Sequence, residues 1–149
     1  MISTEYDVTT IYASNEDPEG LEYGFEVKAS REASGCIESV AIIDFTEGEM
    51  MEMPIEVALL FAESLRGVQD RPLAPAPDSE TVVFDSSDVQ GLNQDGYQIT
   101  IERDSRSAIE NIVLTDLGED VEIVCDPIIA YGMAIALEGL DAFPARRLH

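Results

Sequence analysis

The chain has 149 residues, of which 45% are apolar, and its 31 acidic and 8 basic residues give a formal charge of −23. This length suits one ordinary domain or two small ones, and the apolar share predicts a folded core. No apolar run approaches the ~20 residues of a membrane-spanning helix. The charge argues against direct binding to nucleic acid, because both molecules are negative. Residues 1–10 also lack the basic start and apolar stretch of a signal peptide, so we expect a cytoplasmic protein.

The two halves of the chain resemble each other at a fixed offset. A shift of 72 positions aligns residues 37–68 with 109–140, and eight of these 32 pairs are identical. The first-copy members are Ile37, Glu38, Asp44, Glu47, Ala58, Ala62, Leu65 and Gly67. Upstream, a shift of 74 pairs Tyr23, Phe25 and Val27 with Tyr97, Ile99 and Ile101, which fits a shorter loop after the second strand in the second copy. We therefore predict a tandem duplication.

Each copy is predicted to contain four strands followed by one helix. Strands are indicated at 8–14, 23–28, 37–45 and 50–53 by alternating or continuous apolar residues. Pro54 suits the first position of a helix, and Gly67 suits a left-handed residue after its end. Residues 1–71 thus form a first repeat, and the proline-rich residues 72–78 form a stiff, extended connector.

The second repeat, residues 79–149, follows the same order. Its opening strand is expected at 81–84, and Asp126 is placed to cap a helix that starts with Pro127 and closes at Gly139. The predicted fold class is α+β: a duplicated strand-strand-strand-short strand-helix unit, with antiparallel sheets each covered by one helix. We expect the two repeats to pack side by side as one compact body.

The second helix has almost no polar face between Ile128 and Leu137. A helix that is apolar all round is expected to be buried on all sides. Packing between the two repeats would bury it. The alternative is a homodimer interface through the Ile128–Leu137 helix.

Several classes of chemistry lack the residues they need. The only histidine is the terminal His149, so a Ser–His–Asp or Cys–His site is not expected. Cys36 and Cys125 lie far apart among strand-like residues, which predicts buried free thiols. Asp95-Gly96 reads as a hairpin turn in preference to part of a calcium loop. Because no nucleotide-binding, metalloprotease or hydrolase motif is present, we predict no enzyme activity, metal or cofactor.

The negative charge is the feature that needs an explanation, because self-repulsion destabilises a compact state. A compact chain of this length is about 38 Å across. A piece of duplex DNA of that length carries about 22 negative charges. In size and charge alone the chain resembles phage-encoded inhibitors of bacterial defence, such as DNA mimics and anti-CRISPR proteins. That resemblance implies a basic, nucleic-acid-binding protein as the partner.

Two other interpretations stay open. Lys28 is the only lysine against seven arginines, and acids are spread over both halves, as in proteins adapted to a salty cytoplasm. An immunity or adaptor protein for a basic toxin has the same composition. If the acidic surface binds a partner, the clustering of acidic residues along the chain predicts that three stretches form the binding site. They comprise Glu16, Asp17 and Glu19; Glu47, Glu49 and Glu52; and Glu119, Asp120 and Glu122. The turns at 47–49 and 119–121 are equivalent in the repeat, so they are expected to form a paired or continuous acidic ridge.

Overall fold

The computed structural model describes residues 6–11, 24–32, 35–68, 77–92 and 96–141. The first copy contains β1 (Tyr6–Ile11), β2 (Phe25–Arg31), β3 (Ile37–Asp44), β4 (Glu49–Pro54) and α1 (Ile55–Gly67). The second contains β5 (Glu80–Asp85), a 3₁₀ turn (Ser86–Asp88), β6 (Tyr97–Arg103), β7 (Ile109–Asp116), β8 (Val121–Cys125) and α2 (Pro127–Asp141). Each copy forms a four-stranded antiparallel sheet, in the orders β1-β2-β3-β4 and β5-β6-β7-β8. The predicted α+β duplication is therefore confirmed, while the predicted connector lies mostly outside the described residues.

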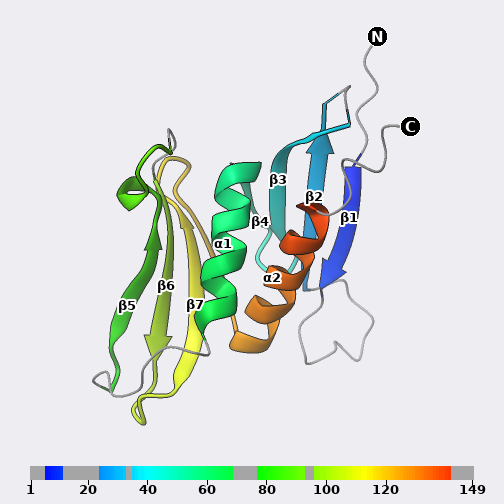
Figure 1. The fold of residues 1–149 in the computed structure, drawn as a ribbon. Coiled ribbons are helices and arrows are strands. Elements are labelled where there is room, and N and C mark those ends of the chain that lie inside the picture. Colours follow the sequence, from blue (N-terminus) through cyan, green and yellow to red (C-terminus); the bar gives the residue numbers. More distant parts are fainter. Residues whose placement is uncertain (1–5, 12–23, 33–34, 69–76, 93–95, 142–149) are drawn as a thin grey trace, which may run out of the picture.

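The two helices lie between the sheets and join the copies (Figure 1). α1 contacts β3 and β4 of its own sheet and also β5 and β6, whereas α2 contacts β7 of its own sheet and also β1 and β2. The helices also pack against each other. Strands β4 and β8, the last strand of each sheet, lie next to each other while belonging to separate sheets. We call this boundary between β4 and β8 the seam.

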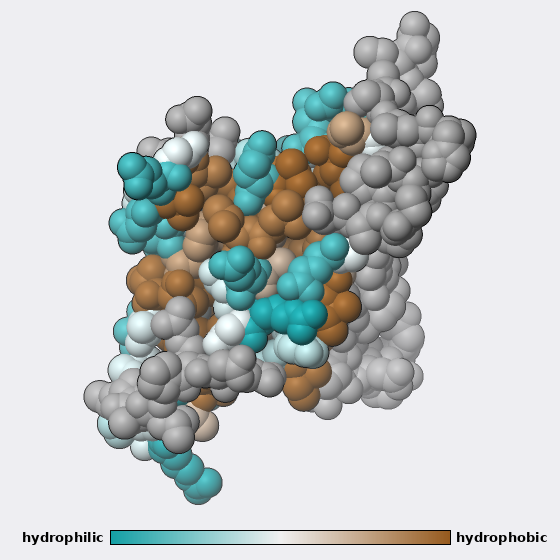
Figure 2. Space-filling view, in the orientation of Figure 1, coloured by the Kyte–Doolittle hydropathy of each residue, from teal (hydrophilic) through white to brown (hydrophobic). Residues whose placement is uncertain are grey.

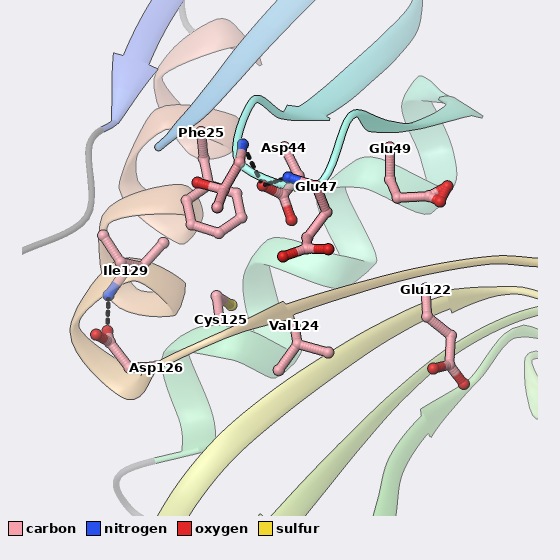
Figure 3. A pocket seen from close by; sticks show the side chains of 10 residues that line it. Phe25, Asp44, Glu47, Glu49, Glu122, Val124, Cys125, Asp126 and Ile129 are labelled. Atoms are coloured by element: carbon pink, nitrogen blue, oxygen red, sulfur yellow. Dashed lines mark hydrogen bonds between the residues drawn. The ribbon is translucent and has the colours of Figure 1, made fainter. Parts of the chain in front are cut away.

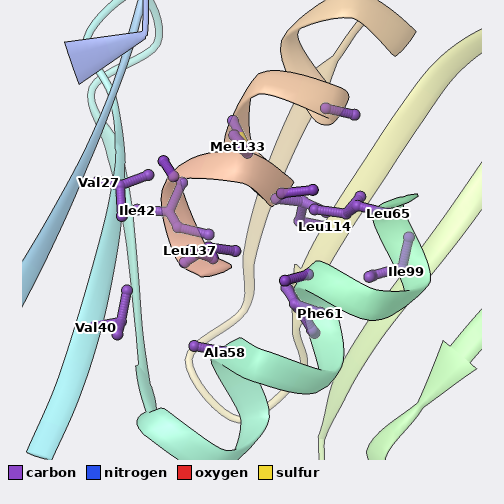
Figure 4. Packing of buried hydrophobic residues seen from close by; sticks show 14 of the residues in the cluster. Val27, Val40, Ile42, Ala58, Phe61, Leu65, Ile99, Leu114, Met133 and Leu137 are labelled. Carbon is purple, nitrogen blue, oxygen red and sulfur yellow. The ribbon is translucent and has the colours of Figure 1, made fainter. Parts of the chain in front are cut away.

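One hydrophobic core serves both copies, as expected for repeats packed side by side. Figure 4 shows side chains from the first sheet, both helices and the second sheet meeting in it. Phe61 of α1 is fully buried, and its ring meets that of Phe84 in β5 edge-to-face, with centroids 5.4 Å apart. Aromatic pairs of this geometry add stabilisation beyond the apolar area they bury. Neither copy buries its apolar face without the other.

The strand register corrects the alignment of the two copies. Phe25 pairs with Asp44 between β2 and β3, and Tyr97 pairs with Asp116 between β6 and β7. Tyr97 is thus the counterpart of Phe25, and the shift is 72 already in the second strand, so the predicted shift of 74 is wrong. The loops after β2 and β6 have equal length, and the difference lies between the first and second strands. Side chains alternate with a period of two along a strand, so both even shifts place apolar residues on apolar ones.

The corrected alignment reveals a buried arginine in each copy. Arg31 and Arg103 follow equivalent bulges, and both side chains are buried. Nη1 of Arg31 donates to the carbonyl of Gly35, and Nη1 of Arg103 donates to that of Ser107. These two arginines hold the loops that follow β2 and β6.

α2 starts at Pro127 as predicted, whereas α1 starts at Ile55, and the predicted first helical residue, Pro54, is the extended last residue of β4. The ends of both helices also differ from the prediction. Oδ1 of Asp126 accepts the backbone N–H of Ile129 at 2.8 Å, which confirms the predicted cap of α2. Gly67 and Gly139 lie within the helices and have no positive φ, so the predicted left-handed ends are wrong. α1 instead continues into Val68, whose backbone stays right-handed, and Val68 is buried. Burial of that side chain favours one more residue of helix.

Asp44 is expected to be important for stability. Its side chain is 2% exposed, and Oδ1 accepts the backbone N–H groups of Thr46 (2.9 Å) and Glu47 (3.2 Å) in the β3–β4 turn. Asp44→Ala leaves both donors without this acceptor, so we expect a loss of about 3 kcal/mol in the free energy of unfolding, measured in urea. Asp88→Ala removes the same charge at an exposed position and is the matched control. Equal stability of the two variants would contradict this role.

Candidate functional site

Carboxylates from both copies meet at one end of the seam, around a cleft of about 570 Å³. The first copy contributes Phe25, Asp44, Thr46, Glu47 and Glu49, and the second contributes Glu122, Val124, Cys125, Asp126 and Ile129. Figure 3 shows these side chains on β2, the end of β3, the β3–β4 turn, the start of β4, β8 and the start of α2. The cleft therefore exists only because the two copies pack together.

The acids around the cleft have two different tasks. Asp44 and Asp126 accept backbone N–H groups and hold the β3–β4 turn and the start of α2 in place. The carboxylates of Glu47, Glu49 and Glu122, by contrast, make no hydrogen bond or ion pair with any other described residue. These three side chains are exposed or half-buried. They are available to an external cation, whereas Asp44 and Asp126 are structural.

The floor of the cleft is apolar. Phe25 and Ile129 are buried beneath it, and Val124 is 45% exposed on β8. An apolar floor beneath a carboxylate rim suits a ligand group with an aliphatic stem and a positive end. Lysine and arginine side chains have that construction.

The other end of the seam is also acidic, and Tyr97, Glu52 and Glu38 line a second cleft of about 590 Å³ there. Tyr97 Oη donates to the backbone carbonyl of Glu52 at 3.0 Å and so ties β6 to β4. Partial burial raises the pKa of Tyr97, and the nearby charges of Asp116, Glu52 and Glu119 raise it further. Carboxylates of both copies, Glu52 from the first and Glu119 from the second, thus act on Tyr97.

The positions of these glutamates test whether the two equivalent turns form one acidic ridge. Glu47 and Glu49 lie with Glu122 at the cleft, whereas Glu119 does not line it and acts on Tyr97 instead. The turn at 47–49 therefore meets β8 of the other copy, and the equivalent turn at 119–121 does not join it at the cleft. The described candidates, which also include the exposed Asp120, are spread along the seam; Glu16, Asp17 and Glu19 lie outside the described residues.

Sequence reasoning missed the apolar part of the cleft and the turn contacts of Asp44 and Asp116. Asp44 carried a signal, because it is identical to Asp116 in the repeat, and Asp116 Oδ1 likewise accepts a backbone N–H in its turn, from Glu119. Val124 and Ile129 carried no signal, because they read as ordinary strand and helix residues. Their part in the cleft depends on how the two copies pack.

The second helix was expected to be buried on all sides, and this prediction is wrong. Ile128 is 69% exposed, Tyr131 38% and Ile135 50%. These three side chains are spaced along one face of α2, while its other apolar residues enter the shared core. Packing between the repeats therefore covers α2 only in part.

The two cysteines differ in environment, which corrects the prediction that both are buried. Cys36 is exposed in the loop after β2, since that loop runs over the surface. Cys125 is buried, and burial raises the pKa of its thiol. A buried thiol with a raised pKa is a poor nucleophile at neutral pH. Cys125 lines the cleft as an apolar group.

Within the described ranges, no cluster of three or more histidine, cysteine or acidic side chains is arranged to hold a metal ion. None of the described helices combines the length and the apolar character needed to cross a membrane. Comparisons with protein-family models, curated protein sequences and solved structures found no match to this chain.

Proposed function

We propose that this chain is a non-catalytic, acidic inhibitor that occupies the nucleic-acid-binding surface of a basic partner protein in the cytoplasm. One observation carries the proposal. Glu47, Glu49 and Glu122, from both copies, surround a cleft with an apolar floor and have no cationic partner among the described residues. Three unpaired carboxylates around one cleft favour a positively charged ligand group.

The cleft fits a lysine or arginine side chain of the partner. The aliphatic stem of such a residue would pack on Val124 and Phe25, and its charged end would meet the carboxylates of the rim. Arginine is favoured, because its planar guanidinium binds carboxylates through two parallel hydrogen bonds.

The net charge of the chain supports a partner that normally binds nucleic acid. The chain carries −23. A compact body of this length is about 38 Å across, and duplex DNA of that span carries about 22 negative charges. The nucleic-acid-binding surface of a partner would therefore meet about as many negative charges on this chain as on a DNA duplex of the same length. Long-range attraction would speed association at low salt.

Capture of the partner from cell lysate, followed by displacement with DNA, tests this proposal. The immobilised chain is loaded at about 50 mM KCl, where exposed charges interact over a long range. We expect a basic protein to bind, to elute as KCl rises, and to be released at constant salt by a short DNA duplex. Dextran of equal mass is the control and should release nothing.

Two outcomes would contradict the proposal. A captured protein that salt elutes but the duplex does not would use a surface other than its nucleic-acid site, as a basic toxin bound by an immunity protein would. Capture that is unchanged in molar KCl would show that charge does not carry the binding.

A further inference from the structure

Helices α1 and α2 occupy equivalent places in the fold and bury equivalent positions. α1 buries Val57, Ala58, Phe61, Ala62 and Leu65, and each has a buried counterpart 72 residues later in α2. The two helices therefore meet the same structural demands on their inner faces. Any difference between their outer faces is therefore not required by the packing of the inner faces.

The outer faces differ in character. Ile128 of α2 is 69% exposed, and the residue at this position in α1 is the exposed Glu56. Ile135 is 50% exposed, and its α1 counterpart is the exposed Glu63. Because α1 carries glutamate at both positions, the fold does not require an apolar residue there. We define Ile128, Tyr131 and Ile135 as the α2 stripe.

One ion pair lies beside the α2 stripe. Arg66 of α1 makes an ion pair with Glu138, with Nη2 and Oε1 2.9 Å apart, and its guanidinium lies 5.7 Å from the centroid of the Tyr131 ring. The pair cancels one negative charge beside the stripe. Figure 2, which views the side on which the helices lie, shows apolar side chains covering much of this face around a small polar group.

These observations point to a second copy of this chain as the occupant. Two molecules of charge −23 repel each other over most of their surface. The α2 stripe is exposed and apolar, and the Arg66–Glu138 pair beside it supplies both signs of charge, so contact between two copies is least opposed there. We propose that the chain forms a two-fold homodimer in which the α2 stripe of each copy packs against that of the other. A two-fold contact brings the same patch from both copies together, and Arg66 and Glu138 give that patch both signs of charge.

The dimer and the proposed inhibition respond to salt in opposite ways. Screening weakens attraction to a basic partner, whereas it reduces the repulsion between two copies of this chain. The dimer is therefore expected to strengthen as KCl rises. It does not depend on the proposed function, because the α2 stripe shares no residue with the cleft.

Sedimentation equilibrium tests the dimer directly. At about 100 μM protein, in about 50 mM and about 500 mM KCl, we expect twice the chain mass of 16.3 kDa to be more populated at the higher salt. I128E/I135E installs the glutamates that α1 carries at these positions, so it should fold. We expect it to raise the dissociation constant about 100-fold or more, as loss of buried hot-spot residues does.

A second double variant is the matched control. M50E/L117E adds the same charge at two other exposed apolar residues, Met50 (53%) and Leu117 (57%), and should leave the dimer unchanged. A wild-type mass of one chain at both salt concentrations would overturn the proposal whatever the variants do. Equal weakening by both double variants would also overturn it, because added charge alone would then be the cause.

Discussion

E47Q/E49Q/E122Q is expected to weaken binding of the captured partner about 100-fold or more, because truncation of close interfacial charge pairs costs several kcal/mol. The three glutamates surround the cleft and make no ion pair with described residues, so the fold should not need them. Titration calorimetry with the purified partner at about 100 mM KCl measures the dissociation constant, and the melting curve verifies the fold.

E63Q/E80Q/E110Q separates the cleft from the general charge. It removes the same three negative charges at exposed positions on α1, β5 and β7, away from the cleft. We expect it to weaken binding about threefold, because distant exposed charges contribute mainly through a screened long-range field. Equal losses in the two triple variants would mean that overall charge carries binding and the cleft does not. Unchanged binding in both would contradict an acidic binding surface altogether.

The number, order and type of the elements followed from the sequence because those patterns are local. Alternating apolar residues predicted β2 and β6, and Asp126 before Pro127 predicted the start of α2, where the cap is present. The repeat was visible because equivalent positions in the two copies bury their side chains in the same core. Local patterning and burial are what a single sequence records most directly.

Alternation did not fix the register between the copies, and this hid one equivalence. A shift of 74 aligned apolar residues as well as the observed shift of 72, since the two differ by a whole period of the strand. Arg31 and Arg103 correspond only at 72. Their shared role, holding the loop after β2 or β6 through a carbonyl, was therefore invisible in the alignment.

The sequence predicted several of the charged residues of the candidate site but did not predict how they are arranged. Clustering identified Glu47, Glu49 and Glu122, which the structure gathers from two copies around one cleft. It placed Glu119 in the same ridge, whereas Glu119 does not line the cleft. Which turn faces which strand depends on how β4 meets β8. No local pattern encodes that contact.

The exposed face of α2 shows the same limit. The sequence of α2 is apolar on every side, which predicted full burial, but the core needs only the positions that α1 also buries. Ile128 and Ile135 remain outside it. Composition thus reports that a helix is apolar, while the comparison with α1 reports which apolar residues the fold does not use.

The response of stability to salt separates a working acidic surface from adaptation to a salty cytoplasm. We expect the protein to melt cooperatively at about 20 mM KCl, because the core that both copies share offsets the self-repulsion of a −23 chain. In about 1 M KCl, where screening acts within ~3 Å, the melting temperature should rise by about 5–10 °C. Circular dichroism measures both curves, and sucrose of equal osmolality controls for effects other than screening. A chain that folds only in molar KCl would assign its charge to the environment. A chain that folds at low salt carries that charge without needing salt, which leaves the carboxylates of the seam free to bind a partner.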